Sequence, residues 1–374
     1  MERVIAEINL VSLRKNLQIV RDCAPGRKIL AMVKGNAYGH GMVTIAKALM
    51  DVDFLGVASL DEALALRHAG VMQPIVLTSG FMTAEDLNTV MEYHIQPFIF
   101  ESYQLGLLKQ KISAKKGKKS TQSKLLDLWL KVDTGMNRLG FSPEVSLEVW
   151  RELYLMQQKE QLVHSITWIT HFACADKEDS LETLEQIDLF SVLTEEMGEA
   201  KSAANSAAIL QYPEAHFDIV RPGKMLYGIS PLPLTFEGYR KLFPVMTLRA
   251  RVIALSQVEK GAGVGYGAKW KAPKVSKVAV VSLGYGDGYP QNAPEGTPVL
   301  IRGKMLSLVG QVSMDSLTVD VSSLAQVNIH DEVIFWGEDL PIEYVATVMR
   351  STPSALLTGL TPRVSREVLR FDID

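Results

Sequence analysis

Lys34 is the residue of this sequence with the clearest chemical potential. It follows a run of five apolar residues, 29–33, and precedes three glycines within seven positions, Gly35, Gly39 and Gly41. A continuous apolar run of this length is typical of a strand buried on both faces in a parallel sheet. A lysine at the end of such a strand is either a solvated strand end or an amine in a partly desolvated cavity, where its pKa falls and it becomes nucleophilic.

Other residues that can move protons or bind anions follow the same strand, as Tyr38 does, or further predicted strands. They are Tyr38, Lys131, Arg138, His171, Asn205, Ser206, Arg221, Gly223 and Lys224. Each alone fits an ordinary role, His171 as a core histidine and Arg221 as a salt-bridged strand end. Because the active site of a β/α barrel forms at the carboxyl ends of its strands, we expect all of them at one mouth with Lys34.

The elements that would hold these residues alternate between apolar strands and amphipathic helices. Strands are predicted at 29–33, 54–58, 74–78, 96–100, 126–132, 165–170, 201–204 and 217–220. Helices are predicted between them, with start signals such as the capping-box pair Ser59 and Glu62 and the Ser142-Pro143 pair. Eight strand–helix units in about 200 residues predict an N-terminal (β/α)8 TIM barrel.

From about residue 243 the pattern changes to β-branched, alternating segments separated by Gly, Pro and Asp turns. Strands are predicted at 245–258, 275–283, 297–302, 305–309, 316–321, 331–336 and 364–371, with a helical pair at 342–360. The sequence therefore predicts two domains, a barrel over residues 1–240 and a mainly β domain over residues 241–374. Residues 3–8 also alternate, so residues 1–9 can pair with the β domain instead of the barrel.

The loops after the seventh and eighth strands are the usual phosphate site of this fold. Ser206 and the backbone amides near Gly223 and Lys224 can direct N–H groups at an anion there. A phosphate site and a strand-end lysine together suit a cofactor that carries both a phosphate and an aldehyde, because Lys34 can react with the aldehyde. That cofactor is pyridoxal 5'-phosphate.

The composition and charge of the chain restrict the classes of partner that we expect. The 374 residues carry a formal net charge of -3, which gives no global field for nucleic acid or an anionic membrane. Cys23 and Cys174 are far apart and lack metal-ligand spacing, so we expect free thiols and no metal. The charged N-terminus and the lack of a bilayer-length apolar segment predict a cytoplasmic protein. The lysine-rich segment 113–124 is interpreted as a solvated insertion.

Longer motifs resemble the alanine racemase family. They are AMVKGNAYGHG at 31–41, KVDTGMNRLG at 131–140, THFACAD at 170–176, RPGKMLYG at 221–228, GYGA at 265–268, GYGDGY at 284–289, GQVSMD at 310–315 and RVSR at 363–366. Their length and shared order extend over nearly the whole chain. The family fold, a barrel followed by a β domain, agrees with the elements predicted above.

The resemblance implies a pyridoxal 5'-phosphate-dependent isomerase that interconverts L- and D-alanine and supplies D-alanine for cell-wall peptidoglycan. Lys34 is similar to the lysine that binds the cofactor and carries a proton at the substrate Cα. Tyr266 resembles a second proton carrier on the opposite face. Because a free phenol titrates near ~10, it needs help at neutral pH, which the family pattern assigns to His171 and Arg221.

The resemblance also implies a homodimer with shared active sites, in which Tyr266 reaches the barrel mouth of the other copy. An arginine, Arg221, would face the pyridine nitrogen and weaken the electron sink, which suits a racemase. Lys131 matches a lysine that is carbamylated in some members. The cofactor-binding set would be Lys34, Tyr38, Arg138, His171, Asn205, Ser206, Arg221, Gly223 and Lys224; the substrate-binding set would be Arg138, Tyr285, Met314 and Asp315.

One position departs from the family pattern, and three other interpretations stay open. Ser354 lies where a phosphate-binding tyrosine is usual, so the pocket is either filled there by water or roomier. The same mechanism could act on serine or a larger amino acid. A pyridoxal 5'-phosphate-dependent decarboxylase could share the two-domain plan, although Arg221 counts against it. A non-catalytic cofactor-binding protein would be a single barrel, which the β domain carrying Tyr266 opposes.

Overall fold

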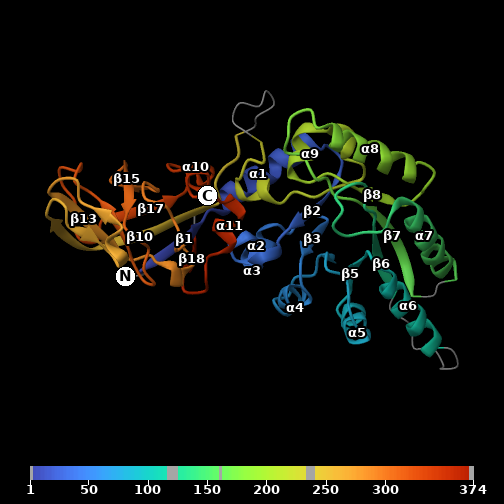
Figure 1. Cartoon of the computed structure of the whole chain (residues 1–374). Coiled ribbons are helices and arrows are strands. Elements are labelled where there is room, and N and C mark those ends of the chain that lie inside the picture. The colour runs from blue at the N-terminus through green and yellow to red at the C-terminus, as the bar shows by residue number, and fades with distance from the viewer. Residues whose placement is uncertain (1–2, 116–124, 160–161, 233–240, 370–374) are drawn as a thin grey trace, which may run out of the picture.

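A parallel barrel and a mainly β unit make up the protein (Figure 1). The computed structural model describes residues 3–115, 125–159, 162–232 and 241–369. Most of the lysine-rich segment 113–124 lies outside these ranges, so its interpretation as a solvated insertion stays a prediction. The predicted architecture, a (β/α)8 barrel followed by a β domain, is confirmed.

Eight parallel strands form the barrel in the order β8-β7-β6-β5-β4-β3-β2-β9. They are β2 (Lys28–Met32), β3 (Phe54–Val57), β4 (Ile75–Leu77), β5 (Ile95–Ile99), β6 (Leu126–Lys131), β7 (Val163–Ile169), β8 (Ala200–Ser202) and β9 (Ile219–Val220). The N–H of Asp218 donates to the carbonyl of Lys201 at 3.1 Å and connects the two ends of the sheet. Large side chains, including Trp129 and Phe98, form a separate buried cluster across these strands, so the barrel interior is packed.

Helices between the strands cover the outside of the barrel (Figure 1). They are α1 (Leu10–Cys23), α3 (Met42–Ala48), α4 (Leu60–His68), α5 (Ala84–Glu92), α6 (Ser102–Lys115), α7 (Pro143–Gln158), α8 (Leu181–Thr194) and α9 (Ser206–Gln211). In α1 the apolar stripe of Leu13, Leu17 and Val20 is fully buried. Ser142 caps α7 as predicted.

The predicted capping box at α4 forms only in part. Ser59 accepts the N–H of Glu62 at 3.2 Å, which is the first half of the box. The carboxylate of Glu62 instead accepts the N–H groups of Ala58, Gly35 and Asn36. The glutamate is therefore shared between its own helix and the loop that follows Lys34.

The β domain is built around one long strand, β10 (Met246–Val258), which pairs with β1, β13 and β17. Its other strands and α-helices are β1 (Val4–Ile8), β11 (Gly263–Val264), β12 (Trp270–Lys271), β13 (Ser276–Val281), β14 (Pro298–Ile301), β15 (Lys304–Val309), β16 (Leu317–Asp320), β17 (Glu332–Trp336), β18 (Ser365–Val368), α10 (Ile342–Val348) and α11 (Pro353–Thr358). The pairing of β13 with both β10 and β16 closes six of these strands into a ring. The first strand of the chain, β1, belongs to this C-terminal sheet.

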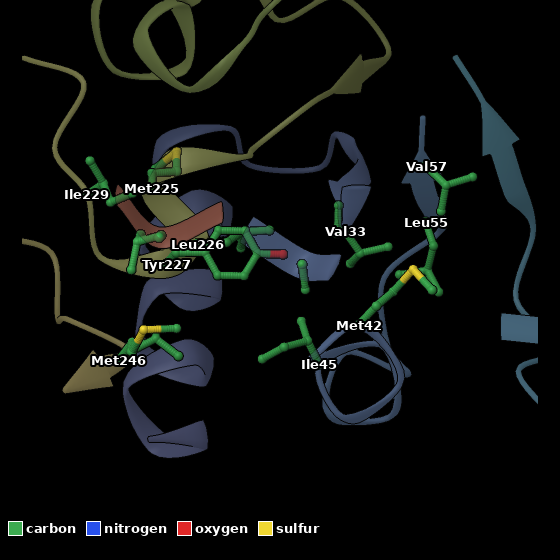
Figure 2. Packing of buried hydrophobic residues seen from close by; sticks show 14 of the residues in the cluster. Val33, Met42, Ile45, Leu55, Val57, Met225, Leu226, Tyr227, Ile229 and Met246 are labelled. Atoms are coloured by element: carbon green, nitrogen blue, oxygen red, sulfur yellow. The ribbon is translucent and has the colours of Figure 1, made fainter. Parts of the chain in front are cut away.

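One buried cluster continues from the barrel into the β domain. Figure 2 shows part of it, with Val33 and Ile45 from the barrel, Tyr227 from the turn η2 (Lys224–Tyr227), and Met246 from β10. Figure 1 shows α11 of the β domain beside α2 (Lys34–Tyr38), the turn that follows β2. The β domain thus packs directly against the segment that carries Lys34.

Replacement of Gly39 by alanine tests this contact. A Cβ at Gly39 would lie 2.1 Å from the carbonyl oxygen of Leu357 in α11, and its φ is +82°. Gly70 is a matched control, because its φ is +80° and a Cβ there meets no atom of the described chain within 4 Å. We expect Gly70→Ala to lower the free energy of unfolding by about 1 kcal/mol and Gly39→Ala by about 3 kcal/mol. Urea unfolding measures both, and equal losses would contradict the predicted clash.

Candidate active site

A cavity of about 480 Å³ opens at the carboxyl ends of the barrel strands. Its lining includes every barrel residue that the sequence analysis singled out: Lys34, Tyr38, Lys131, Arg138, His171, Asn205, Ser206, Arg221, Gly223 and Lys224. These residues come from the ends of β2, β6, β7, β8 and β9 and from the loops after them. The barrel therefore collects the predicted amine, phenol, imidazole and guanidinium in one place.

The surroundings of the Lys34 amine favour its neutral form. Burial is the main cause that lowers the pKa of Lys34, and the positive charges of Arg138 and Arg221 lower it further. The negative charge of Glu62 nearby raises this pKa instead. More of the amine is therefore neutral, and nucleophilic, at a given pH than in an exposed lysine.

The chain after Lys34 forms a left-handed turn that the sequence analysis did not predict. Residues 35–39 all have positive φ, with values of 64°, 53°, 54°, 50° and 82°. Three of these residues, Asn36, Ala37 and Tyr38, have a Cβ, for which this conformation costs about 1–2 kcal/mol each. The turn brings Tyr38 back to the cavity that Lys34 enters. The glycines at 35 and 39 and the αL-tolerant Asn36 were the signal that could have revealed it.

Arg221 is buried and fixed by neutral acceptors. Nη1 donates to Oγ of Ser202 at 2.8 Å, and Nη2 donates to the carbonyls of Thr170 at 2.7 Å and Ala203 at 2.8 Å. Burial lowers the pKa of Arg221 to about 9, so the guanidinium stays charged at neutral pH. Its Nε–H and its second Nη1–H donate to no acceptor within the described part of the chain, so the Nε–H is available to a ligand in the cavity.

His171 is held in a defined protonation state by Arg221. Nη2 of Arg221 lies 3.3 Å from Nδ1 of His171 and shares its two hydrogens among this nitrogen and the carbonyls of Thr170 and Ala203. Because arginine only donates, Nδ1 is the acceptor in this contact. Burial, followed by the charges of Arg221 and Lys131, lowers the pKa of His171 well below its ordinary value. The ring is therefore neutral at pH 7, with its hydrogen on Nε2.

Lys131 is a second lysine with an altered pKa. Its Nζ donates to the carbonyl of Val132 at 2.8 Å, and burial is the main cause that lowers its pKa to about 7. The nearby Arg221 lowers this pKa further, whereas Asp133 raises it. A considerable fraction of the Lys131 amine is thus neutral at physiological pH. Asp133, which the sequence analysis did not assign, also orders the loop by accepting the N–H of Arg138 at 3.2 Å.

The predicted phosphate site differs in detail from the sequence-based expectation. The Gly223 amide donates to Oγ of Ser206 at 2.9 Å, and Oδ1 of Asn205 caps α9 by accepting two amides at 3.1 Å. The backbone amides of Ser206 and Lys224 donate to no acceptor among the described residues. Tyr38 also lies close, since a Cβ at Gly223 would be 2.7 Å from its hydroxyl. Hydroxyl groups and backbone amides thus converge at this end of the cavity.

The predicted site residues of the β domain lie elsewhere on this chain. Tyr266, Tyr285, Met314 and Asp315 are not part of the cavity lining. Tyr266 is 70% exposed and follows a two-residue strand, β11 (Gly263–Val264), which is too short for a periodicity signal. Met314 is 51% exposed. Within one chain, the structure therefore brings together the barrel half of the predicted site only.

A buried carboxylate holds two of these β-domain loops together. Asp287 forms ion pairs with Arg3 and Arg363, and it accepts the amide of Gly284 at 3.0 Å. Arg363 also pairs with Asp315 at 2.5 Å. The carbonyl of Met314 accepts the amide of Gly286 at 2.9 Å, so the loops carrying Tyr285 and Met314 form one unit. Asp287 lies inside the GYGDGY motif at 284–289, but the sequence analysis assigned it no role.

Three further observations bear on the predictions. The Oγ of Ser354 is buried, bonds to no described residue and does not line the cavity. No group of three or more His, Cys, Asp or Glu side chains that could hold a metal ion occurs among the residues that the structure describes. No helix in the described ranges has the length and apolar character needed to cross a membrane.

Comparison with protein families matches both halves of the chain. A family described as "Alanine racemase, N-terminal domain" matches residues 8–231, and "Alanine racemase, C-terminal domain" matches residues 245–368. An alanine racemase of Shewanella sediminis is 43% identical over 360 residues, which cover 96% of this chain and 97% of the relative. An alanine racemase of Aeromonas hydrophila is 42% identical over 367 residues, covering 98% and 99%.

Solved structures agree with the sequence relatives. The biosynthetic alanine racemase of Pseudomonas aeruginosa superimposes with a TM-score of 0.89 at 36% identity, covering 99% of this chain and 100% of that one. An alanine racemase of Bartonella henselae, solved with covalently bound pyridoxal phosphate, has a TM-score of 0.87 at 27% identity with the same coverage.

Proposed function

The chain belongs to the alanine racemase family, a family of isomerases, and from this premise we propose that it is a pyridoxal 5'-phosphate-dependent enzyme that interconverts L- and D-alanine. We further propose that it acts in the cytoplasm and supplies D-alanine for cell-wall peptidoglycan. One observation carries the proposed chemistry. A lysine with a lowered pKa and an arginine held by neutral acceptors share the barrel cavity.

The residues of the cavity suit pyridoxal 5'-phosphate at both ends. Lys34 offers a partly neutral amine to the aldehyde. At the other end, the hydroxyls of Tyr38 and Ser206 and the amides of Ser206 and Lys224 are available to a phosphate. The uncommitted Nε–H of Arg221 can donate to a ring nitrogen. The relative from B. henselae, which carries covalently bound pyridoxal phosphate, supports this assignment.

We assign proton transfer at the substrate Cα to two side chains on opposite faces. The bound cofactor supplies an electron-withdrawing ring that acidifies the Cα proton. Lys34 takes or returns this proton on one face, and the partner subunit's Tyr266 does so on the other. His171, neutral and fixed by Arg221, can donate its Nε2–H to the tyrosine oxygen and favour the ionised phenol.

Arg221 favours racemisation over competing reactions. As a permanent donor it would leave the ring nitrogen of the bound cofactor without a proton, which would limit how strongly the ring withdraws electrons. A proton would then return to Cα promptly, which would disfavour transamination. A carboxylate at this position would protonate the ring nitrogen and favour decarboxylation or transamination instead.

We also propose that the active unit is a homodimer whose two copies share their active sites. We propose that residues 1–240 bind the cofactor and that residues 241–374 complete the site of a second copy, with Tyr285, Met314 and Asp315 beside the substrate. Arg138 would bind the substrate carboxylate or the ring hydroxyl. Lys131, with a pKa of about 7, has the neutral amine that carbamylation by carbon dioxide requires, and the resulting negative charge would hold Arg138.

A chiral assay of L-amino acids, with and without added pyridoxal 5'-phosphate, tests this function. We expect L-alanine to give D-alanine fastest, with serine and larger amino acids slower. A preference for serine would keep the mechanism and change the substrate. Release of carbon dioxide and an amine in place of the D-amino acid would indicate the decarboxylase and contradict the proposal.

The pH dependence of cofactor capture provides a second test. The neutral amine is the reactive form, and the pKa of Lys34 is lowered, so neutral Lys34 is lost only when the pH falls below this lowered value. We expect the rate at which apo-protein takes up pyridoxal 5'-phosphate to rise with pH and to level off at a lower pH than it does for an ordinary lysine. Stopped-flow absorbance measures the rate, with Nα-acetyl-lysine as the control. A midpoint equal to that of the control would contradict the desolvated amine.

A further inference from the structure

The left-handed turn α2 connects the two groups that end the cavity. Lys34 begins the turn and Tyr38 lies at its end, and both line the cavity. Three consecutive residues with a Cβ adopt a conformation that L-residues rarely hold unless their surroundings impose it. Whatever holds this turn therefore sets where the amine lies relative to the phenol.

Glu62 binds the beginning of the turn. Its Oε1 accepts the N–H of Gly35 at 2.7 Å and that of Asn36 at 3.2 Å, while its Oε2 accepts the N–H of Ala58 at 2.9 Å. The glutamate is itself anchored in the first turn of α4, where Ser59 accepts its amide. Hydrogen bonds to an ionised carboxylate are stronger than neutral ones, so this side chain is a firm attachment point.

His40 and Arg366 bind the end of the turn. Nδ1 of His40 lies 3.0 Å from the carbonyl of Ala37 and 2.9 Å from that of Tyr38, and because carbonyls only accept, Nδ1 carries the hydrogen. Nε of Arg366 donates to the carbonyl of Gly39 at 2.7 Å. The other N–H groups of Arg366 bind the carbonyls of Leu360, Thr361 and Val364. The β domain thus holds the far end of the turn.

We propose that Glu62, His40 and Arg366 are positioning residues that hold the left-handed turn, and that Glu62 fixes the Lys34 amine relative to the Tyr38 hydroxyl. None of the three lines the cavity, so each positions the cavity residues through the backbone of the turn. The negative charge of Glu62 also raises the pKa of Lys34, against the lowering by burial. The inference rests on the proposed function, in which the amine and the hydroxyl bind opposite ends of one cofactor. It adds residues outside the cavity to the machinery that captures this cofactor.

Hydrogen exchange in the apo-protein tests the attachment directly. We expect Glu62→Ala to speed exchange at the amides of Gly35 and Asn36 at least about tenfold, because both lose their acceptor. Asp61→Ala is the matched control, since Asp61 is exposed, carries the same charge and lies in the same turn of α4. The control should leave both amides within about twofold of the unmodified protein.

Cofactor affinity tests the functional consequence. Titration with pyridoxal 5'-phosphate should give a dissociation constant about tenfold higher, or more, for Glu62→Ala and an unchanged one for Asp61→Ala. Glu62→Gln should lie between them, because its amide keeps one acceptor oxygen but places an N–H group against that of Ala58. If the melting temperature shows that Glu62→Ala is unfolded, Glu62→Gln serves as the test variant in its place.

The possible outcomes distinguish failure of the positioning role from failure of the proposed function. If Glu62→Ala, or Glu62→Gln when alanine unfolds the chain, matches Asp61→Ala in both exchange and affinity, the positioning role is wrong. Faster exchange over the whole chain, without a larger change at Gly35 and Asn36, would refute it as well. An unmodified protein that binds no pyridoxal 5'-phosphate would refute the proposed function instead, while the exchange comparison still reports on the turn.

Discussion

Replacement of Lys34 by alanine is expected to abolish alanine racemisation in both directions, with a loss of about 1,000-fold or more. The variant loses both the covalent anchor of the cofactor and one of the two proton carriers. The fold should persist, because Lys34 lies close to the positive charges of Arg138 and Arg221 and its removal relieves that repulsion. The visible absorption band of covalently bound cofactor should disappear with the activity.

Chiral chromatography, absorbance and thermal unfolding measure these three effects in one preparation. Lys47→Ala is a suitable control, because Lys47 is an exposed lysine of α3 and does not line the cavity. The control should retain the band and the activity. A Lys34→Ala variant that keeps the absorption band, or racemises alanine at a rate near that of the unmodified protein, would contradict the assignment of Lys34.

Tyr266→Phe is expected to slow racemisation by about 100-fold or more while leaving cofactor binding intact. The equilibrium constant between enantiomers is unity, so kcat/KM for racemisation must fall equally in both directions. Exchange of the Cα hydrogen with deuterated water behaves differently. The enantiomer whose proton is taken by Lys34 should still exchange, whereas the enantiomer that depends on Tyr266 should not.

Mass spectrometry of recovered L- and D-alanine measures this asymmetry. Tyr103→Phe is the control, since Tyr103 is an exposed tyrosine of α6 and lies outside the cavity. The control should leave exchange from both enantiomers unchanged. Equal loss of exchange from L- and D-alanine in Tyr266→Phe would contradict proton carriers on opposite faces.

The barrel half of the site was predictable because parallel strands order their own ends. Each apolar run that was identified as a strand fixed the position of the residue after it, which placed Lys34, His171 and Arg221 at one mouth. The alternation of apolar and polar residues also predicted the long strand β10. The fold class followed from the same alternation, without any knowledge of single contacts.

Other parts of the site depend on contacts that no local pattern records. The bond from Gly35 to Glu62 joins residues far apart in the sequence, and the capping-box motif at Ser59 suggested a different partner for that carboxylate. The ion pairs of Asp287 similarly connect the two ends of the chain. Asn205 has the residue type of a ligand, yet its side chain caps α9. Such roles follow only from the tertiary structure.

Mixing Lys34→Ala with Tyr266→Phe protein tests the central claim, a site built from two copies, most directly. In a mixed dimer, one of the two sites receives Lys34 from the tyrosine variant and Tyr266 from the lysine variant, and is intact. With random exchange of subunits, half of the dimers are mixed, so about a quarter of the unmodified activity should return. If native mass spectrometry confirms mixed dimers and no racemisation of alanine returns, the shared site is wrong.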